Sequence, residues 1–237
     1  FYRSSDKTIV FDKSTMSGLG SIQPNNTGNG VFLFAVKPSS ELASLRQPTI
    51  TLSVSVSGKR IEGGRLPETI ESTITKTIKV ATELGVSGRI VRTVGSIENT
   101  GPWPPKADTE TTYTVELEAR NTINTVAGAT LRVQLPSYVR YTGTSIPQGE
   151  IGYDSATHEL TWTPGNIGAG EVKKVAFQIA FLPSVSQKGT SPILIPASTL
   201  SGTDRFTQTT VSASLPSFTT QTATDPNYQT SFGTVSP

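Results

Sequence analysis

Very few residues of this chain could do acid–base or nucleophilic chemistry, because its 237 residues include one histidine and no cysteine. The histidine, His158, lies close to Asp154 and Ser155, which are the residue types of a hydrolase triad. Neighbours within one turn rarely converge with triad geometry, and the G-x-S-x-G sequence of a nucleophile elbow is absent. We therefore interpret His158 as a surface turn residue, predict no catalytic residue and expect that the chain is not an enzyme.

Metal-binding residue types are equally sparse. Without cysteine there are no thiolate sites, and a single histidine excludes multi-histidine sites. We expect no cofactor, although oxygen ligands from separate loops could hold a structural calcium ion. The acids that could supply them are Asp108, Glu110, Asp154, Asp204 and Asp225.

A lysine–asparagine isopeptide bond would suit a surface domain without cysteine. Lys79, Asn121 and Glu118 supply the residue types that such a bond needs, and the sequence leaves open whether they meet. The glycine cluster within Gly165–Gly170 has the reverse order of a dinucleotide fingerprint and precedes no helix pattern, so we interpret it as a loop.

Two groups of residues could contact a ligand. Trp103, Tyr138 and Tyr141 could form an aromatic platform for a glycan. The alternative for Trp103, which stands between two prolines, is a staple that seats the proline-rich connection on the domain. The turn at residues 59–65 carries three cations around a Gly-Gly pair; a solvated loop is the simpler interpretation, and an anionic glycan or phosphate is the alternative.

The elements that must position these residues are strands. The chain contains 36 threonines and 27 serines, 16 % charged residues and a net charge of +2. Threonine favours strands, whereas serine, glycine and proline favour turns. The longest apolar run, Val31 to Val36, has six residues; it predicts a core strand and is too short for a membrane span. The small net charge gives no reason to expect nucleic acid.

Apolar residues alternate with polar ones in most of the chain, which is typical of strands with one buried face. The pattern runs through 50–56, 70–80, 84–94, 113–119, 129–135, 151–162, 175–181 and 206–213. A helix fits only at residues 40–45. The side chains predicted to form the core are Tyr113, Leu131, Trp162, Phe177 and Phe181.

Period-two segments separated by turns, with no helices between them, predict an all-β chain of two immunoglobulin-like β-sandwich domains in tandem. We place a small sandwich at residues 1–82 and a second sandwich at 83–222. Residues 223–237 are rich in Thr, Ser, Gly and Pro and predict a loosely held C-terminal tail.

Short motifs follow one another in order between residues 84 and 222. They are Tyr113-Thr-Val with Asn121, Ala129-Thr-Leu-Arg-Val-Gln-Leu-Pro136, Tyr138-Val139, Ile151, Tyr153-Asp154, Thr157, Glu159-Leu-Thr-Trp162, Gly165-Asn-Ile167, Ala169-Gly170 and Val175 to Phe181. This region resembles the "conserved repeat domain" family, the immunoglobulin-like modules of prokaryotic cell-surface proteins. The resemblance implies a multi-domain extracellular protein, often anchored in a membrane; because this chain has no such anchor, we expect it to be part of a longer precursor.

The expected function is that of a structural module of an extracellular or cell-surface protein: an adhesin, a surface-layer component or a fibre. The alternative is a glycan-binding module of a surface protein or secreted enzyme. We expect partners to be neighbouring domains or copies of the chain itself, which associate through their ends. Residues 1–12 are either donated as a strand to another subunit or form the first strand of their own domain.

Overall fold

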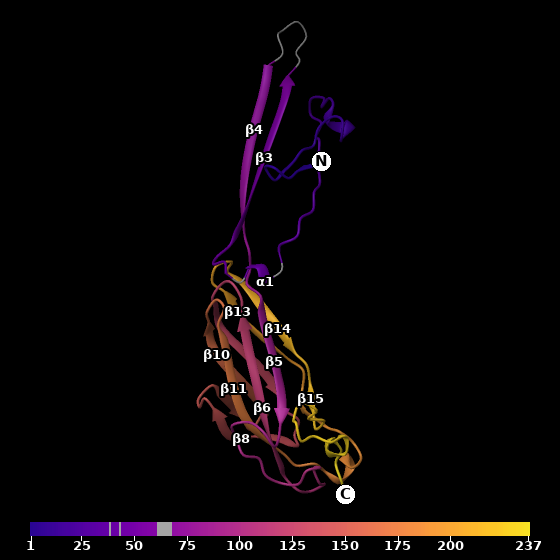
Figure 1. Cartoon of the computed structure of the whole chain (residues 1–237), viewed down its shortest axis with the longest axis vertical. Coiled ribbons are helices and arrows are strands. Elements are labelled where there is room, and N and C mark those ends of the chain that lie inside the picture. Colours follow the sequence, from indigo (N-terminus) through magenta and orange to yellow (C-terminus); the bar gives the residue numbers. More distant parts are fainter. Residues whose placement is uncertain (38, 43, 61–67) are drawn as a thin grey trace. The chain divides into compact units, whose positions relative to one another are not determined.

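The structure is a computed structural model that describes residues 1–37, 39–42, 44–60 and 68–237. It divides into one unit of residues 1–38 and a second unit of residues 39–237. Nearly all of the regular structure is β (Figure 1), which confirms the predicted all-β class. None of the helices among the described residues has the length and hydrophobicity that a membrane span requires.

The first unit contains two short strands, β1 (Tyr2–Arg3) and β2 (Thr8–Ile9), and the 3-10 helix η1 (Ser17–Leu19). β1 and β2 pair antiparallel. The N-terminal ammonium group donates a hydrogen bond to the Val10 carbonyl at 2.9 Å, and the Val10 N–H donates to the Phe1 carbonyl at 2.9 Å. Residues 1–10 therefore close a small hairpin on themselves, and their donation to another subunit stays a prediction.

The second unit begins with helix α1 (Ser39–Leu42), the short helix predicted nearby, and a long hairpin of β3 (Thr49–Arg60) and β4 (Glu68–Lys79) (Figure 1). The two strands pair antiparallel in unbroken register from Thr49 opposite Lys79 to Arg60 opposite Glu68. Their sequences are rich in β-branched residues, which favour strands. Successive side chains point to opposite faces, so the apolar residues of both strands share one face.

The remaining strands form a sandwich of two antiparallel sheets. One sheet has the order β5–β6–β11–β8, and the other has the order β14–β13–β7–β10–β9. Their bounds are β5 (Leu84–Val91), β6 (Thr111–Asn121), β7 (Val126–Gln134), β8 (Val139–Ile146), β9 (Ile151–Asp154), β10 (Glu159–Ile167), β11 (Val172–Phe181), β13 (Ser198–Asp204) and β14 (Thr209–Leu215). The smaller elements are β12 (Ile193–Ile195), which pairs with β15 (Phe218–Thr219), and the 3-10 helices η2 (Val185–Gln187) and η3 (Thr230–Gly233).

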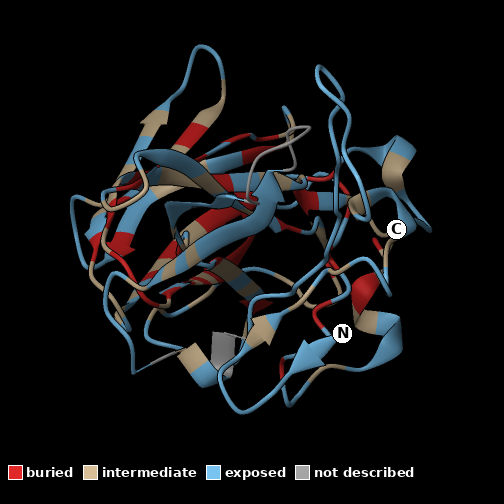
Figure 2. Cartoon of the chain, turned by 90° about the horizontal axis from the view of Figure 1, so that it is seen from above, coloured by how far each residue is buried: buried red, intermediate tan, exposed pale blue. Residues whose placement is uncertain are grey.

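Side chains from both sheets fill one core, and Figure 2 shows buried residues in these strands and in segments that connect them. Trp162 on β10 lies opposite Leu131 on β7, and its indole N–H donates to the Glu150 carboxylate at 3.1 Å. Tyr113, Phe177 and Phe181 lie in the same core, and none of these five side chains is more than 1 % exposed.

Residues 1–82 differ from the small sandwich predicted there. The described part of this region contains two separate two-stranded ladders, and no buried apolar residue precedes Leu84. Val31 to Val36, predicted as a core strand, belongs to no strand and is exposed along its whole length. The prediction was wrong here because apolar alternation and apolar runs show only that a segment favours a covered environment, and do not say that the same chain provides it.

Residues 223–237 also differ from the loosely held tail predicted there. Val235 is 2 % exposed and belongs to the core. Its N–H donates to the Thr190 carbonyl at 3.0 Å, and the Ser236 N–H donates to the Pro105 carbonyl at 2.7 Å. Backbone hydrogen bonds and one buried valine hold this segment, and neither is visible in a composition of Thr, Ser, Gly and Pro.

Candidate functional site

The hairpin of β3 and β4 carries an apolar face that the other described residues of its own unit, 39–237, leave in solvent. We call it the hairpin apolar face. Its most exposed members are Val54, Val56, Ile70 and Ile74, which are 48 %, 64 %, 50 % and 70 % exposed. The remaining members are Ile50, Leu52 and Ile78, which are partly buried. A contiguous apolar patch of this kind marks an interaction surface more often than a free surface.

The opposite face of the same hairpin is polar. The Ser55 and Thr73 hydroxyls are hydrogen-bonded across the strands at 2.9 Å, and those of Ser53 and Thr75 at 3.3 Å. The two faces therefore differ in polarity, although Lys76, which lies opposite Leu52, is on the same side as the hairpin apolar face. Because a lone two-stranded hairpin is marginally stable in water, the apolar face needs a cover.

The hairpin apolar face has a low point near its centre. Ser72 lies opposite Val56, and Gly58 lies opposite Ile70. No heavy atom comes within 4 Å of the position where a Cβ on Gly58 would lie. Because Ser72 has a short side chain and Gly58 has none, the hairpin apolar face is recessed at these two positions.

A second exposed apolar feature is the segment Val31 to Val36, which we call the apolar run. Val31 and Leu33 are 79 % and 94 % exposed, and Phe34 is 51 % exposed. The rings of Phe32 and Phe34 stack with centroids 6.2 Å apart, so these two side chains lie on the same side of the segment. The sequence pattern had shown that the run is apolar but not that it lies outside every sheet.

A polar network fixes the end of β4 to the sandwich. The Lys79 ammonium donates to the Phe206 carbonyl at 2.9 Å, and the Asn124 amide donates to the Val80 carbonyl and to the Asp204 carboxylate at 2.9 and 2.8 Å. Burial disfavours the charged form of Asp204, but hydrogen bonds from Asn124 and from three backbone N–H groups outweigh it and hold the pKa below its usual value. The base of the hairpin is thus held by an exposed hydrogen bond from Lys79 and a partly buried one to Val80, next to the buried Asn124–Asp204 pair.

His158 does not form a triad in the described structure. Its Nδ1 lies 3.1 Å from the Tyr153 hydroxyl, and its backbone adopts a left-handed φ of 57°, which agrees with a turn position. The Asp154 carboxylate accepts the backbone N–H of Ala156 at 2.8 Å. These hydrogen bonds within the turn lower the pKa of Asp154, and both side chains stabilise the β9–β10 turn.

The three aromatic residues predicted for glycan contact do not share a set of ring neighbours. Trp103 is partly buried against Phe232, with ring centroids 4.6 Å apart, and against Tyr228 at 6.3 Å. These contacts favour the interpretation of Trp103 as a staple, which packs the proline-rich connection against the C-terminal segment. Tyr138 packs edge-on against Phe181 and Tyr141 against Phe177 and Tyr153; glycan contact by these residues stays a prediction.

Lys79, Asn121 and Glu118 make separate hydrogen bonds. The Lys79 ammonium binds the Phe206 carbonyl, the Asn121 amide donates to the Ile167 carbonyl at 2.9 Å, and Glu118 pairs with Lys174 at 3.0 Å. The structure therefore does not bring these three side chains together for an isopeptide bond.

Among the residues that the structure describes, no three potential ligands of the His, Cys, Asp and Glu types cluster, and a calcium ion stays an untested prediction. Lys59 and Arg60 end β3, whereas Gly63, Gly64 and Arg65 of the predicted basic turn lie outside the described residues.

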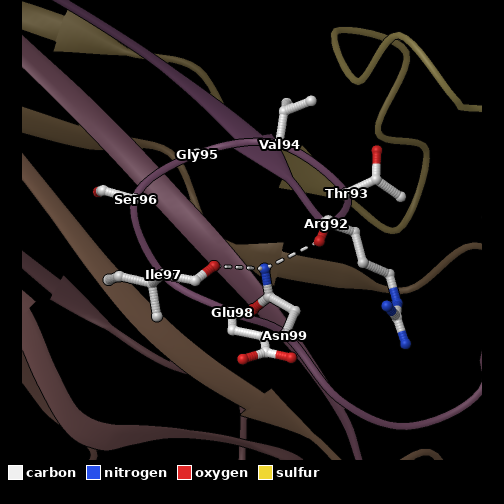
Figure 3. Close-up of a pocket in the computed structure, with 8 residues that line it drawn as sticks. All are labelled: Arg92, Thr93, Val94, Gly95, Ser96, Ile97, Glu98 and Asn99. Atoms are coloured by element: carbon white, nitrogen blue, oxygen red, sulfur yellow. Dashed lines mark hydrogen bonds between the residues drawn. The ribbon is translucent and has the colours of Figure 1, made fainter.

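A surface hollow lies inside the loop Arg92–Asn99 (Figure 3). The Asn99 amide crosses it and donates to the Arg92 carbonyl at 3.1 Å and to the Ile97 carbonyl at 3.4 Å. It also donates to the Thr114 hydroxyl at 2.9 Å. The polar group inside the loop thus holds the loop closed and secures it to β6.

No protein-family model matches the chain, and no curated protein matches it. Two solved structures of BcpA, the major pilin subunit of Bacillus cereus, are similar to part of it. Identity is 10 % in one and 8 % in the other, with TM-scores of 0.38 and 0.39, and each match covers 68 % of this chain and 51 % of the pilin chain. The chain thus spans about half the length of the pilins, and its resemblance to the conserved repeat domain family stays a prediction.

Proposed function

We propose that this chain is a structural subunit of an extracellular or cell-surface fibre and acts by association with copies of itself. The observation that carries the proposal is the hairpin apolar face, which the described residues of its own unit leave exposed although the hairpin has the residue pattern of a strand pair with one covered face. Burying such a face on another subunit would contribute roughly 25 cal/mol for each Å² of apolar surface removed from water.

The arrangement of the polar groups supports a structural role. The buried carboxylates Asp204 and Asp225 accept hydrogen bonds from backbone N–H groups of neighbouring loops. Asp154 does the same in an exposed turn. Each of these acids therefore stabilises the fold. The hairpin apolar face, in contrast, has no such stabilising role within the single chain.

Self-association can be measured directly on the purified 237-residue chain. Light scattering over a wide concentration range should show a mass that rises with concentration, and electron microscopy should show fibres. Sulfate should strengthen the association, because it strengthens apolar burial. A chain that stays monomeric at high concentration in sulfate would contradict the proposal.

A further inference from the structure

We propose that the hairpin apolar faces of two copies pack on each other about a two-fold axis. The inference rests on the proposed self-association and names the contact that the two copies make. It uses only β3 and β4, which both belong to the unit of residues 39–237. Two sheets that pack face to face cover each other's apolar side chains, as the two layers of a β-sandwich do.

A lysine on the hairpin apolar face limits what can cover it. Lys76 lies opposite Leu52, and it shares its face with Ile74 and Ile78 because alternate residues of a strand point the same way. An entirely apolar partner would bury this ammonium group without a counter-ion, which is costly. A suitable cover therefore presents a carboxylate opposite Lys76.

The same face of a second copy carries that carboxylate. Among the described residues of β3 and β4, Glu68 is the one acid on this face, and within its own hairpin it lies opposite Arg60. Ser72 lies midway between Glu68 and Lys76 on β4. A two-fold axis that passes the Val56–Ser72 pair at right angles to the strands places each Lys76 over Glu68 of the other copy. One axis therefore forms two identical ion pairs.

The same axis matches large side chains with small ones. It places Val54 over Gly58 of the second copy, where the hairpin apolar face is recessed. Ile74 then lies over Ile70 of the second copy, and the two Ser72 side chains lie closest to the axis. Packed sheets lie about 10 Å apart, and their facing side chains interdigitate. Size and charge thus agree on the same register.

A two-fold axis parallel to the strands is the other way to place the two faces together. It would lay β3 of one copy over β4 of the other at the same level. Lys76 would then lie over Leu52 of the second copy, which offers no counter-ion. The position of Lys76 therefore favours the antiparallel arrangement.

The contact uses the same face of both copies, so it is isologous and closes after two copies. Pairing therefore produces a dimer. The dimer is then the unit from which the proposed fibre grows.

Cross-linking tests whether Ser72 lies near the axis. The chain has no cysteine, so the full-length variant Ser72→Cys presents a single thiol. The matched control is Ser57→Cys, which places a thiol on the polar face of the same hairpin; both positions are exposed. With a short bis-maleimide cross-linker, we expect at least tenfold more covalent dimer from Ser72→Cys than from the control.

Charge reversal tests the ion pairs. In low salt, where surface charges are least screened, Lys76→Glu and Glu68→Lys should each raise the dissociation constant of the dimer at least tenfold, because like charges then face each other. Lys59→Glu and Glu71→Lys are matched controls on the polar face, and we expect them to dimerise like the unchanged chain. All four positions are exposed, so circular dichroism should show that all four variants fold.

The decisive measurement is a 1:1 mixture of Lys76→Glu and Glu68→Lys. Each variant repels itself, but in a mixed pair both contacts between residues 68 and 76 join opposite charges. Analytical ultracentrifugation should therefore show mixed dimers with a dissociation constant close to that of the unchanged chain. A defect in folding, or a cover supplied by the same chain, would not be repaired by mixing.

The outcomes separate this inference from the proposed function. If the unchanged chain associates but both charge reversals associate equally well, or if Ser57→Cys cross-links as readily as Ser72→Cys, self-association stands and the contact proposed here is wrong. If the two reversals are monomeric and their mixture forms no dimers, antiparallel pairing of the two faces is overturned. If the unchanged chain itself stays monomeric, both proposals fail.

Discussion

Asp225 shows how single residues hold this domain together. The residue is 3 % exposed, and its carboxylate accepts the backbone N–H groups of Arg92 and Thr93, each at 2.7 Å, and that of Asn227 at 3.0 Å. Burial disfavours the charged form, but these bonds and one from the Thr93 hydroxyl outweigh it, so the pKa of Asp225 lies below its usual value. One carboxylate thereby joins the C-terminal segment to the end of β5.

The replacement Asp225→Asn should lower the free energy of unfolding at pH 7 by about 1–3 kcal/mol, because it removes charge-assisted hydrogen bonds in a buried site. Since the folded-state pKa is lowered, the stability from the charge is present above the unfolded-state pKa of about 3.9 and is lost as the pH falls through the folded-state value. Urea titrations at pH 7 and in acid should therefore show a smaller acid loss in the variant.

The control is Asp154→Asn, which removes a carboxylate that also accepts backbone N–H groups but lies in an exposed turn. We expect a smaller change from it. If the two replacements lower the free energy of unfolding equally, burial does not increase the contribution of Asp225 to stability.

Core residues were the easiest part of the molecule to predict. Trp162 and Leu131 alternate with polar neighbours, and both are buried. Asp225 was considered only as a calcium ligand, because an acid in a polar segment gives no sign of the backbone groups that surround it. The role of a buried acid depends on loops that are distant in sequence, and single-sequence patterns carry no such information.

At the scale of elements, the C-terminal segment behaves as part of the sandwich. The isolated bridge between Lys106 and Ser236 is parallel, and Val235 lies between hydrogen bonds to Thr190 and Gly189. The segment therefore supplies an apolar side chain to a core that the strands alone leave incomplete.

The replacement Val235→Ala should lower the free energy of unfolding by about 2 kcal/mol, since two buried methyl groups contribute about 0.8 kcal/mol each and the cavity adds to the loss. Val185→Ala is the control, because Val185 is 55 % exposed. Denaturant titration of both variants gives the comparison. If Val235→Ala changes stability no more than the control, the segment is as loosely held as its composition indicates.

The hairpin shows what alternation can and cannot predict about an element. Alternating apolar residues at 50–56 correctly predicted a strand with two different faces. They gave no information on the partner of the apolar face, because a face buried in the same chain and a face buried in another chain need the same side chains. The candidate surface became visible only when exposure was known.

At the scale of the whole molecule, the core and the candidate surface belong to separate stretches of sequence. Every buried residue among those described lies at or beyond Thr82. The hairpin and the apolar run lie before it. Stability and association should therefore be separable by truncation.

A chain of residues 80–237 should fold alone and stay monomeric. It keeps the Val80 carbonyl that accepts the Asn124 amide and loses the hydrogen bond from Lys79 to Phe206, at a cost of about 1 kcal/mol. Its melting temperature should lie within about 4 °C of that of the full chain. A truncated chain that still forms fibres would place the contact in the sandwich instead.

The exposed apolar run has a consequence for how readily proteases cut the protein. Extended, solvent-exposed backbone is where proteases cut most readily, and Phe32, Leu33 and Phe34 are side chains that chymotrypsin-like enzymes accept. If self-association covers the run, associated subunits are shielded from cleavage while free subunits are cut. Under the proposed self-association, proteases would then remove free subunits and leave associated ones intact.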